Sequence, residues 1–179
     1  MNRSSLRAAI KEYKTSYVDE RMYMSRFLDL LFFDNCFERS LQSGHITASA
    51  WVLTPDHKQV ALLHHKKLNR WLQPGGHADG DENVHRVALK ELEEETGISE
   101  VQLIGNSFFD LDIHTIPSHK EVPEHEHFDI RFAFIANNPT QLKKNNESNE
   151  VAWIAIGNLE EFVGNDASVI RMKEKTLLF

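Results

Sequence analysis

One segment, residues 75–98, constrains this chain more than any other: GGHADGDENVHRVALKELEEETGI. Its second half is helical in pattern, and the apolar face of that helix continues one heptad later as a row of carboxylates. The residues of this single face are Val84, Val87 and Ala88, followed by Glu91, Glu94 and Glu95. At about 100° of rotation per residue, Glu93 points nearly opposite.

Carboxylates on a face that faces the core are unfavourable without a compensating partner. Like-charged neighbours on a helix cost a few tenths of a kcal/mol each, and burial adds a desolvation cost. A divalent cation reverses this balance, because Mg²⁺ and Mn²⁺ prefer hard oxygen ligands. The alternative is a solvated acidic helix face. Two features favour the cation: the acids continue the apolar stripe, and a glycine-rich loop precedes the helix.

The composition is that of one domain of an ordinary globular protein. The chain has 179 residues and a formal charge of −7, which argues against general affinity for nucleic acid or for an anionic membrane. The single cysteine, Cys36, cannot form an internal disulfide, and we expect it to be a small core residue in a reducing compartment. No signal peptide or membrane span is predicted, so we expect a cytoplasmic protein.

The periodicity of apolar residues predicts a helical N-terminus followed by alternating strands and helices. A helical segment is predicted over 3–43 and ends at Gly44. Asp81 is the expected N-cap of the acidic helix, and Gly97 is expected to end it. The remaining predictions are strands at 45–53, 59–65, 101–105, 107–115, 125–136 and 150–156, with helices at 159–164 and 168–179.

The glycine-rich loop and acidic helix together resemble the Nudix box. In that pattern a glycine and five residues precede a glutamate, and seven more residues precede Arg-Glu-aliphatic-any-Glu-Glu-any-Gly-aliphatic. Residues 76–98 match every specified position except one, because Lys90 stands in the place of the arginine. The strands on either side also occur in the expected order, and the strings GHITASAWVL, WLQPGGH and HFDIRF are similar to an uncharacterised bacterial Nudix branch.

The resemblance implies a fold and a division of the chain. The expected fold class is α/β (α+β), a Nudix-type α/β/α sandwich with a mixed β-sheet. Residues 1–44 are expected to form an N-terminal helical extension packed on the core, and residues 45–179 the Nudix hydrolase domain.

The resemblance also implies site residues. Glu91, Glu94 and Glu95 would be the metal ligands, Glu91 is also a candidate base, and the carbonyl of Gly76 would complete the metal shell. Glu82, Lys90 and Gly97 would support the structure of the box. Lys90 keeps the positive charge but lacks the rigid fork of an arginine.

One more acid is expected from the loop before the final strand. Glu147 and Glu150 are the candidates, and we favour Glu147 as a catalytic residue because it lies in a polar loop.

Polar side chains also alternate along two strands that we expect to pair. One strand presents Asp110, Asp112 and His114, and the other presents His125, His127, Asp129 and Arg131. A hydrogen-bonded lattice, a substrate-cavity lining and a second metal site are the three alternatives. We name His77, Arg70, Trp71, His127 and Asp129 as candidates for substrate binding.

The implied activity is hydrolysis of a diphosphate linkage in a nucleoside diphosphate derivative, with Mg²⁺ or Mn²⁺ as cofactor. The alternatives are a non-catalytic nucleotide-sensing module and an enzyme like isopentenyl diphosphate isomerase. The expected partner is a small nucleotide substrate, with no nucleic acid and no membrane. A homodimer through the N-terminal helices is left open, and the base and leaving group of the substrate are not encoded in any motif.

Overall fold

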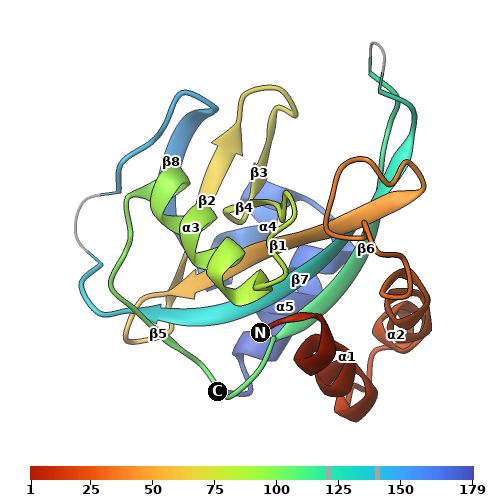
Figure 1. Cartoon of the computed structure of the whole chain (residues 1–179). Coiled ribbons are helices and arrows are strands. Elements are labelled where there is room, and N and C mark those ends of the chain that lie inside the picture. The colour runs from red at the N-terminus through yellow and green to blue at the C-terminus, as the bar shows by residue number, and fades with distance from the viewer. Residues whose placement is uncertain (120–121, 140–141) are drawn as a thin grey trace.

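The computed structural model describes residues 1–119, 122–139 and 142–179. Its centre is a curled, mixed sheet of eight strands (Figure 1). The strands are β1 (Gly44–Leu53), β2 (Gln59–His65), β3 (Arg70–Leu72), β4 (Gly75–His77), β5 (Val101–Leu103), β6 (Asp110–Ile116), β7 (His125–Ala136) and β8 (Ser148–Ala155). The expected fold class, with its mixed sheet, is confirmed.

Strand β1 is the axis of this sheet. It pairs in parallel with β7 along its whole length, while β4 and β2 pair antiparallel with its other edge. Both of its faces are buried, so β1 is apolar or small at nearly every position. The side chains of Ile46, Ala48 and Ala50 belong to one core cluster, and those of Trp51 and Leu53 belong to a second.

Helices cover both faces of the sheet. Helix α3 (Val84–Thr96) lies across one face, and α4 (Leu159–Val163) and α5 (Ala167–Thr176) lie behind the other, with a short 3₁₀ turn, η1 (Ile156–Asn158), leading into α4 (Figure 1). Val84, Val87 and Ala88 pack into the first core cluster, as the apolar face of the segment predicts. Val169 and Met172 of α5 pack into the second cluster.

The N-terminal segment is two helices, α1 (Arg3–Glu12) and α2 (Val18–Leu30), rather than one helical run to residue 43. Thr15 explains the break, because its hydroxyl accepts a hydrogen bond from the Tyr17 backbone amide and donates to Glu20. Such local side-chain bonds compete with helix formation. Beyond α2 the chain forms turns that lead it into β1, where the backbone amide of Ile46 donates to the carbonyl of Cys36.

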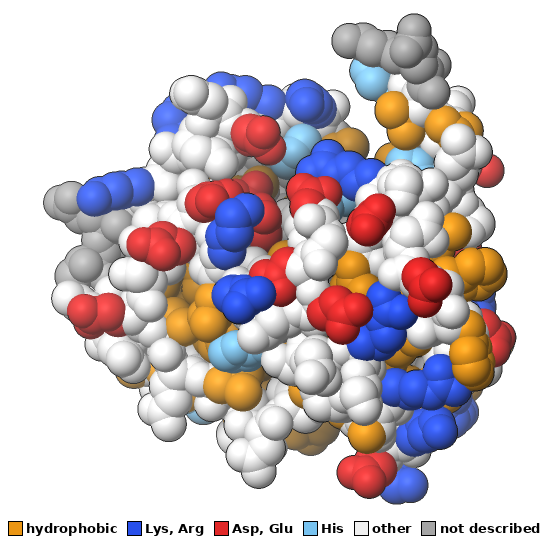
Figure 2. Space-filling model, viewed as in Figure 1, with side chains coloured by type: hydrophobic (Ala, Val, Ile, Leu, Met, Phe, Trp, Pro, Cys, Tyr) orange, Lys and Arg blue, Asp and Glu red, His pale blue; other side chains and the backbone are white. Residues whose placement is uncertain are grey.

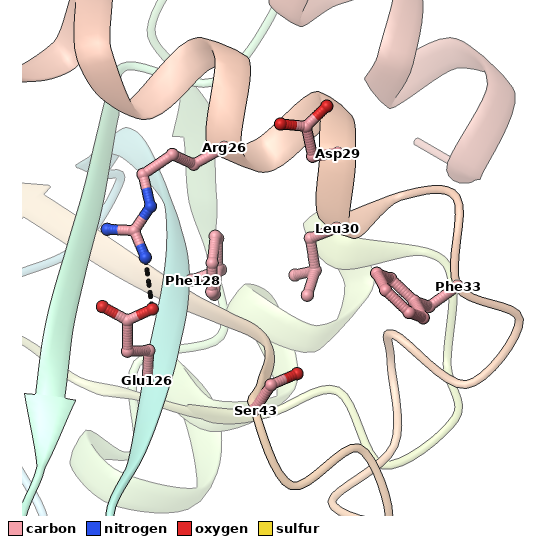
Figure 3. A pocket seen from close by; sticks show the side chains of 7 residues that line it. All are labelled: Arg26, Asp29, Leu30, Phe33, Ser43, Glu126 and Phe128. Carbon is pink, nitrogen blue, oxygen red and sulfur yellow. Dashed lines mark hydrogen bonds and ion pairs between the residues drawn. The ribbon is translucent and has the colours of Figure 1, made fainter.

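Helix α2 packs beside β6, and α1 packs against α2 (Figure 1). Leu6, Ile10 and Phe27 are fully buried in the same core cluster that α3 joins. Figure 3 shows a hollow between α2 and β7, where Arg26 forms an ion pair with Glu126. The division of the chain near residue 44 stays a proposal.

A buried lattice of charges joins α2, β6, β7 and α5. Lys175 Nζ lies 2.6 Å from Glu20 Oε1 and 2.7 Å from Asp110 Oδ2. The guanidinium of Arg171 makes two bonds of 2.8 Å with Asp110, and Arg131 lies 2.9 Å from a carboxylate oxygen of Asp112. Burial raises the pKa of Asp110, but Arg171, Arg131 and Lys175 more than offset that effect and hold it below its ordinary value.

Within the described ranges, no helix is long and apolar enough to cross a lipid bilayer. Cys36 is buried, as expected, and burial raises the pKa of its thiol.

We predict that Asp110→Asn destabilises the protein by about 3–5 kcal/mol, because it leaves three buried cations short of a partner. Urea unfolding followed by circular dichroism measures this change. Asp34→Asn is the control, since the Asp34 side chain is fully exposed, and we expect it to change stability by less than about 0.5 kcal/mol. Equal effects of the two substitutions would contradict a structural role of the lattice.

Candidate active site

The loop before α3 is fixed by the pairing of β4 with β1. Thr47, Ala48 and Ser49 of β1 lie opposite residues 77, 76 and 75 of β4. A β-carbon on Gly76 would lie 2.6 Å from Glu91 Oε2. Only glycine therefore allows the Glu91 carboxylate to lie against this backbone. The structure thus brings Gly76 and Glu91 together, as the box predicts.

Helix α3 begins at a different cap from the expected one. Asn83 is the N-cap, and its side chain accepts a hydrogen bond from the Arg86 backbone amide. Asp81, the predicted cap, instead accepts a bond from the Asn83 amide and forms a two-bond ion pair with Arg86. Because the loop makes one further turn before the helix, the N-cap is Asn83, two residues after the predicted Asp81. Gly97 ends α3 in the left-handed conformation at φ 74°, as predicted.

The three carboxylates differ in exposure along the helix. Glu95 is buried, with 7% of its surface exposed, and its Oε2 accepts a 2.9 Å bond from the Gly75 amide. Glu91 is half-buried, whereas Glu94 is exposed. Figure 2 shows acidic side chains gathered over this face of the molecule, with basic side chains among them. Glu93 is exposed, which agrees with its predicted outward direction.

Burial and mutual repulsion raise the pKa values of Glu91 and Glu95. Burial raises the pKa of Glu95 to about 7, and the charges of Glu91, Glu147 and Glu94 add to this effect. Burial also raises the pKa of Glu91, although Lys90 opposes the change. The ammonium of Lys90 lies 3.5 Å from a carboxylate oxygen of both Glu91 and Glu94. One exposed ammonium does not neutralise three carboxylates, so this donor set fits a divalent cation.

Glu147 lies within electrostatic reach of the box, because its charge raises the pKa of both Glu95 and Arg39. Its backbone carbonyl accepts a bond from the Lys66 amide, which anchors the loop to β2. Glu150 is an exposed residue opposite His64 in the β8–β2 ladder. These placements support Glu147 over Glu150 as the additional acid.

Glu82 connects the box to the N-terminal helix, because its carboxylate lies 3.0 Å from the guanidinium of Arg3. This contact supports the structural role that was predicted for Glu82, which stays a prediction.

The substrate-binding candidates divide into separate groups. His77 and His127 touch each other, with 3.1 Å between their Nε2 atoms. Trp71 packs edge-on against Phe162 of α4, and Arg70 lies 3.4 Å from Asp166. Among the described residues, neither Arg70 nor Trp71 contacts the three glutamates.

Asp129 is buried in the charge lattice. Its carboxylate accepts bonds from the hydroxyls of Thr47 and Ser49 and from Arg131. The predicted pairing of the two polar strands is confirmed, and it places Asp112 opposite Asp129. These contacts satisfy both oxygens of Asp129 inside the protein, so its assignment to substrate binding stays a prediction without support from them.

Three further residues near the site, Arg39, Asp79 and His45, match no specified position of a sequence motif. Arg39 makes a two-bond ion pair with Asp79 at 2.6 and 2.7 Å, and both charges act on His77. His45 is buried beside His127 in the β1–β7 ladder. The alternation of His45, Thr47 and Ser49 along the strand was the available signal for a polar face on β1.

Comparison with known proteins agrees with this geometry. The NUDIX domain model matches residues 44–172. The chain therefore belongs to the NUDIX family, and its fold is that of solved Nudix structures. No curated protein matches the chain.

Solved structures of the same fold include several Nudix enzymes. A C. elegans Ap4A hydrolase superposes with a TM-score of 0.61 at 16% identity, over 75% of this chain and 96% of that one. The E. coli dihydroneopterin triphosphate pyrophosphohydrolase has a TM-score of 0.60 at 15% identity, with 75% and 96% covered. A MutT protein from Methanosarcina mazei Go1 has a TM-score of 0.58 at 17% identity, with 77% and 96% covered.

We predict that Glu95→Gln stabilises the metal-free protein at alkaline pH. The folded-state pKa of about 7 exceeds the ordinary value of 4.5, so the native state binds the extra proton between these values. Stability therefore falls as pH rises from about 4.5 to 7. The variant lacks this penalty, and its carbonyl oxygen can still accept the Gly75 amide.

The gain at pH 8 is expected to reach at most about 3.5 kcal/mol, from about 1.4 kcal/mol per pKa unit. Urea unfolding in a chelating buffer at pH 8 and pH 4.5 measures it, and the two proteins should converge at the lower pH. A variant less stable than the wild type at pH 8 would contradict the raised pKa.

Proposed function

We propose that this protein hydrolyses the diphosphate linkage of a small nucleoside diphosphate derivative, with Mg²⁺ or Mn²⁺ as cofactor. The observation that carries the proposal is the set of three carboxylates at Glu91, Glu94 and Glu95, of which Glu91 is desolvated beside Gly76 and Glu95 beside Gly75. The raised pKa values of Glu91 and Glu95 mean that a cation bound beside them would favour their charged form. A domain that merely binds nucleotides has no need for all three.

The same residues would hold the cation. The carboxylates of Glu91, Glu94 and Glu95 and the carbonyl of Gly76 are oxygen donors of the kind that Mg²⁺ and Mn²⁺ prefer. When bound, the cation would neutralise charge on the diphosphate and lower the pKa of the attacking water.

The chain's own groups would position the reactants. Glu91 is the proposed base, because its raised pKa suits a group that takes a proton from water near neutral pH. Glu147 would orient the water or the diphosphate from the opposite loop. In the reaction, the water oxygen forms a bond to one phosphorus, the bond from that phosphorus to the bridging oxygen breaks, and the bridging oxygen leaves with the other phosphate.

The substrate contacts remain proposals. His77 directly follows Gly76 and is the best placed of the candidates to meet a phosphate or a metal ion. Arg70 and Trp71 lie on β3 beside α4 and would reach only a substrate that extends to that edge of the sheet. We propose a cytoplasmic location for the enzyme, in keeping with its single buried cysteine.

The isomerase-like alternative needs a cysteine at the reaction site. Cys36 is fully buried in the first core cluster, and its thiol pKa is raised by burial. A buried thiol of this kind is a poor proton donor or acceptor for a diphosphate substrate. Hydrolysis is therefore the reading that the described residues favour.

We predict that Glu94→Gln and Glu95→Gln each reduce turnover at least about 100-fold, because each removes a proposed metal ligand. The measurement is phosphate or nucleotide release from a panel of ADP-ribose, NADH, diadenosine polyphosphates, nucleotide sugars and oxidised nucleoside triphosphates, with Mg²⁺ or Mn²⁺. Glu93→Gln is the matched control on the same helix and should retain full activity. Full activity of Glu95→Gln, or nucleotide binding by the wild type without turnover, would sink the proposal.

A second pair of variants separates the two downstream acids. Glu147→Gln is expected to lower kcat by about 10²-fold, the usual effect of losing a group that handles a proton. Glu150→Gln should leave kcat within about twofold, since Glu150 lies exposed on β8. The opposite result would assign the role to Glu150.

A further inference from the structure

Five histidines gather on one face of the sheet, at the end where β1 and β7 begin. The β-ladders place His45 directly opposite His127, and His127 directly opposite His114. His77 lies on the other side of β1, and His125 is two residues before His127 on the same face. They come from four strands that are far apart in the sequence, so they meet only because the chain folds.

Three of these rings are close enough to share one ion. One ligand nitrogen of each of His45, His77 and His127 lies within 4.8 Å of the other two. The shortest separation is 3.1 Å, between Nε2 of His77 and Nε2 of His127. No other group of three or more metal-binding side chains in residues 1–119, 122–139 and 142–179 is this compact.

His45 is the member that a structural role explains least. Only 3% of its surface is exposed, and neither ring nitrogen makes a hydrogen bond of normal geometry with the described residues, although the Leu41 carbonyl lies close enough to oppose the lowering of the ring's pKa by burial. A buried polar group without a partner costs about 1–3 kcal/mol. A core position that needed only bulk would be filled by an apolar residue. Its nitrogens are therefore available to a ligand that the other two rings also face.

We propose that His45, His77 and His127 form a binding site for Zn²⁺ or another late first-row divalent cation. Imidazole nitrogens suit these ions, whereas Mg²⁺ prefers oxygen. Two nitrogens on a tetrahedral zinc ion lie about 3.3 Å apart, given Zn–N bonds of about 2.0–2.1 Å. The His77–His127 separation already has this size, and rotation of the His45 side chain would close the wider gap.

Two more histidines border the site with their orientation fixed. His125 Nδ1 lies 2.9 Å from the Pro123 carbonyl, which can only accept, so this nitrogen carries a proton. His114 Nδ1 lies 3.1 Å from Asp112 Oδ2 and is fixed in the same way. The ring of His125 stacks on that of His45 at 5.1 Å. Both rings border the group of three without belonging to it, and the Asp112–His114 pair has the form of the carboxylate support of a metal-binding histidine.

The charges around the cluster do not exclude a cation. Arg39 is the nearest guanidinium to act on His77, but it is paired with Asp79, so the two charges largely cancel. Burial lowers the pKa of both His77 and His127, and the neighbouring histidines contribute to both shifts. This direction favours neutral imidazole, which is the form that binds a metal.

The competing explanation is a plain hydrogen bond between His77 and His127. That bond would pair one nitrogen on each ring, but it leaves both nitrogens of His45 unpaired. A bound ion would serve all three rings and would link β1, β4 and β7 at the residue directly after Gly76. Its role would be to hold the box loop, and its nitrogen ligands separate it chemically from the carboxylate site. The inference does not depend on the proposed hydrolase activity.

The test uses the full chain, stripped of metal and returned to a buffer with millimolar Mg²⁺ so that oxygen sites are filled. Zn²⁺ is then titrated against a chromophoric chelator. We expect one equivalent to bind to the wild type, and His45→Gln and His127→Gln to lower the Zn²⁺ affinity at least about tenfold. His119→Gln, an exposed histidine outside the cluster, and Glu95→Gln should both keep the wild-type affinity.

Circular dichroism confirms that each variant is folded. If His45→Gln does not fold, the half-buried His77→Gln decides the matter in its place. A second readout is thermal unfolding, in which Zn²⁺ should raise Tm of the wild type and His119→Gln by several degrees but not that of the cluster variants. Equal Zn²⁺ affinity in all variants, or loss only in Glu95→Gln, overturns the proposal. The first outcome means no histidine site, and the second means that zinc binds the carboxylates.

Discussion

The pairing of β4 with β1 is the constraint on which the rest of the site depends. It holds the Gly75–Gly76 backbone edge-on to α3, so that the Gly75 amide meets Glu95 and the bare Gly76 backbone meets Glu91. The two carboxylates are thereby desolvated, and their pKa values rise. A chain with the same acidic helix but without this pairing would present an ordinary solvated face. The raised pKa values of Glu91 and Glu95 therefore depend on the strand beside the helix.

One face of the sheet has two different polar layers. Near the middle of β6 and β7, Asp110, Asp112 and Asp129 are neutralised by Arg131 and by cations from α5. Two residues beyond Asp112 on β6, His114 lies opposite His127, and this pair has no comparable set of charged partners. The same two-residue alternation continues through both layers. The two layers differ in what packs on them. Helix α5 packs over the carboxylates, whereas the histidines lie at the end of the sheet where β1 and β7 begin.

Local patterns predicted the parts of the fold that local physics determines. The strands at 59–65 and 125–136 have the bounds that alternation and turn residues indicate, and Gly97 ends α3 as its freedom at positive φ requires. The break after Glu12 was not predicted, because a threonine hydroxyl that competes for the backbone carries a weak signal.

The polar face needed information that no local pattern holds. Its two strands, β6 and β7, were expected to pair, and the alternation of their residues identified the right side chains. The partner β1 runs parallel to β7 with about 80 residues between them, so the position of His45 beside His127 depends on a long-range register. The cations Arg171 and Lys175 come from a helix whose facing direction was not assigned. The lattice and the histidine cluster were therefore indistinguishable at the level of the sequence.

The buried lattice also limits how the chain can vary. Asp110 is shared by Arg131, Arg171 and Lys175, and Lys175 in turn is shared with Glu20 of α2. A single change at any of these positions leaves a buried charge unmatched, whereas a joint change to apolar residues of similar volume need not be harmful. These positions are expected to drift together or stay fixed. Because Glu20 lies on α2, a substitution there is expected to change the effect of substitutions in the sheet and in α5. The sequence of the N-terminal helices therefore cannot vary independently of the core.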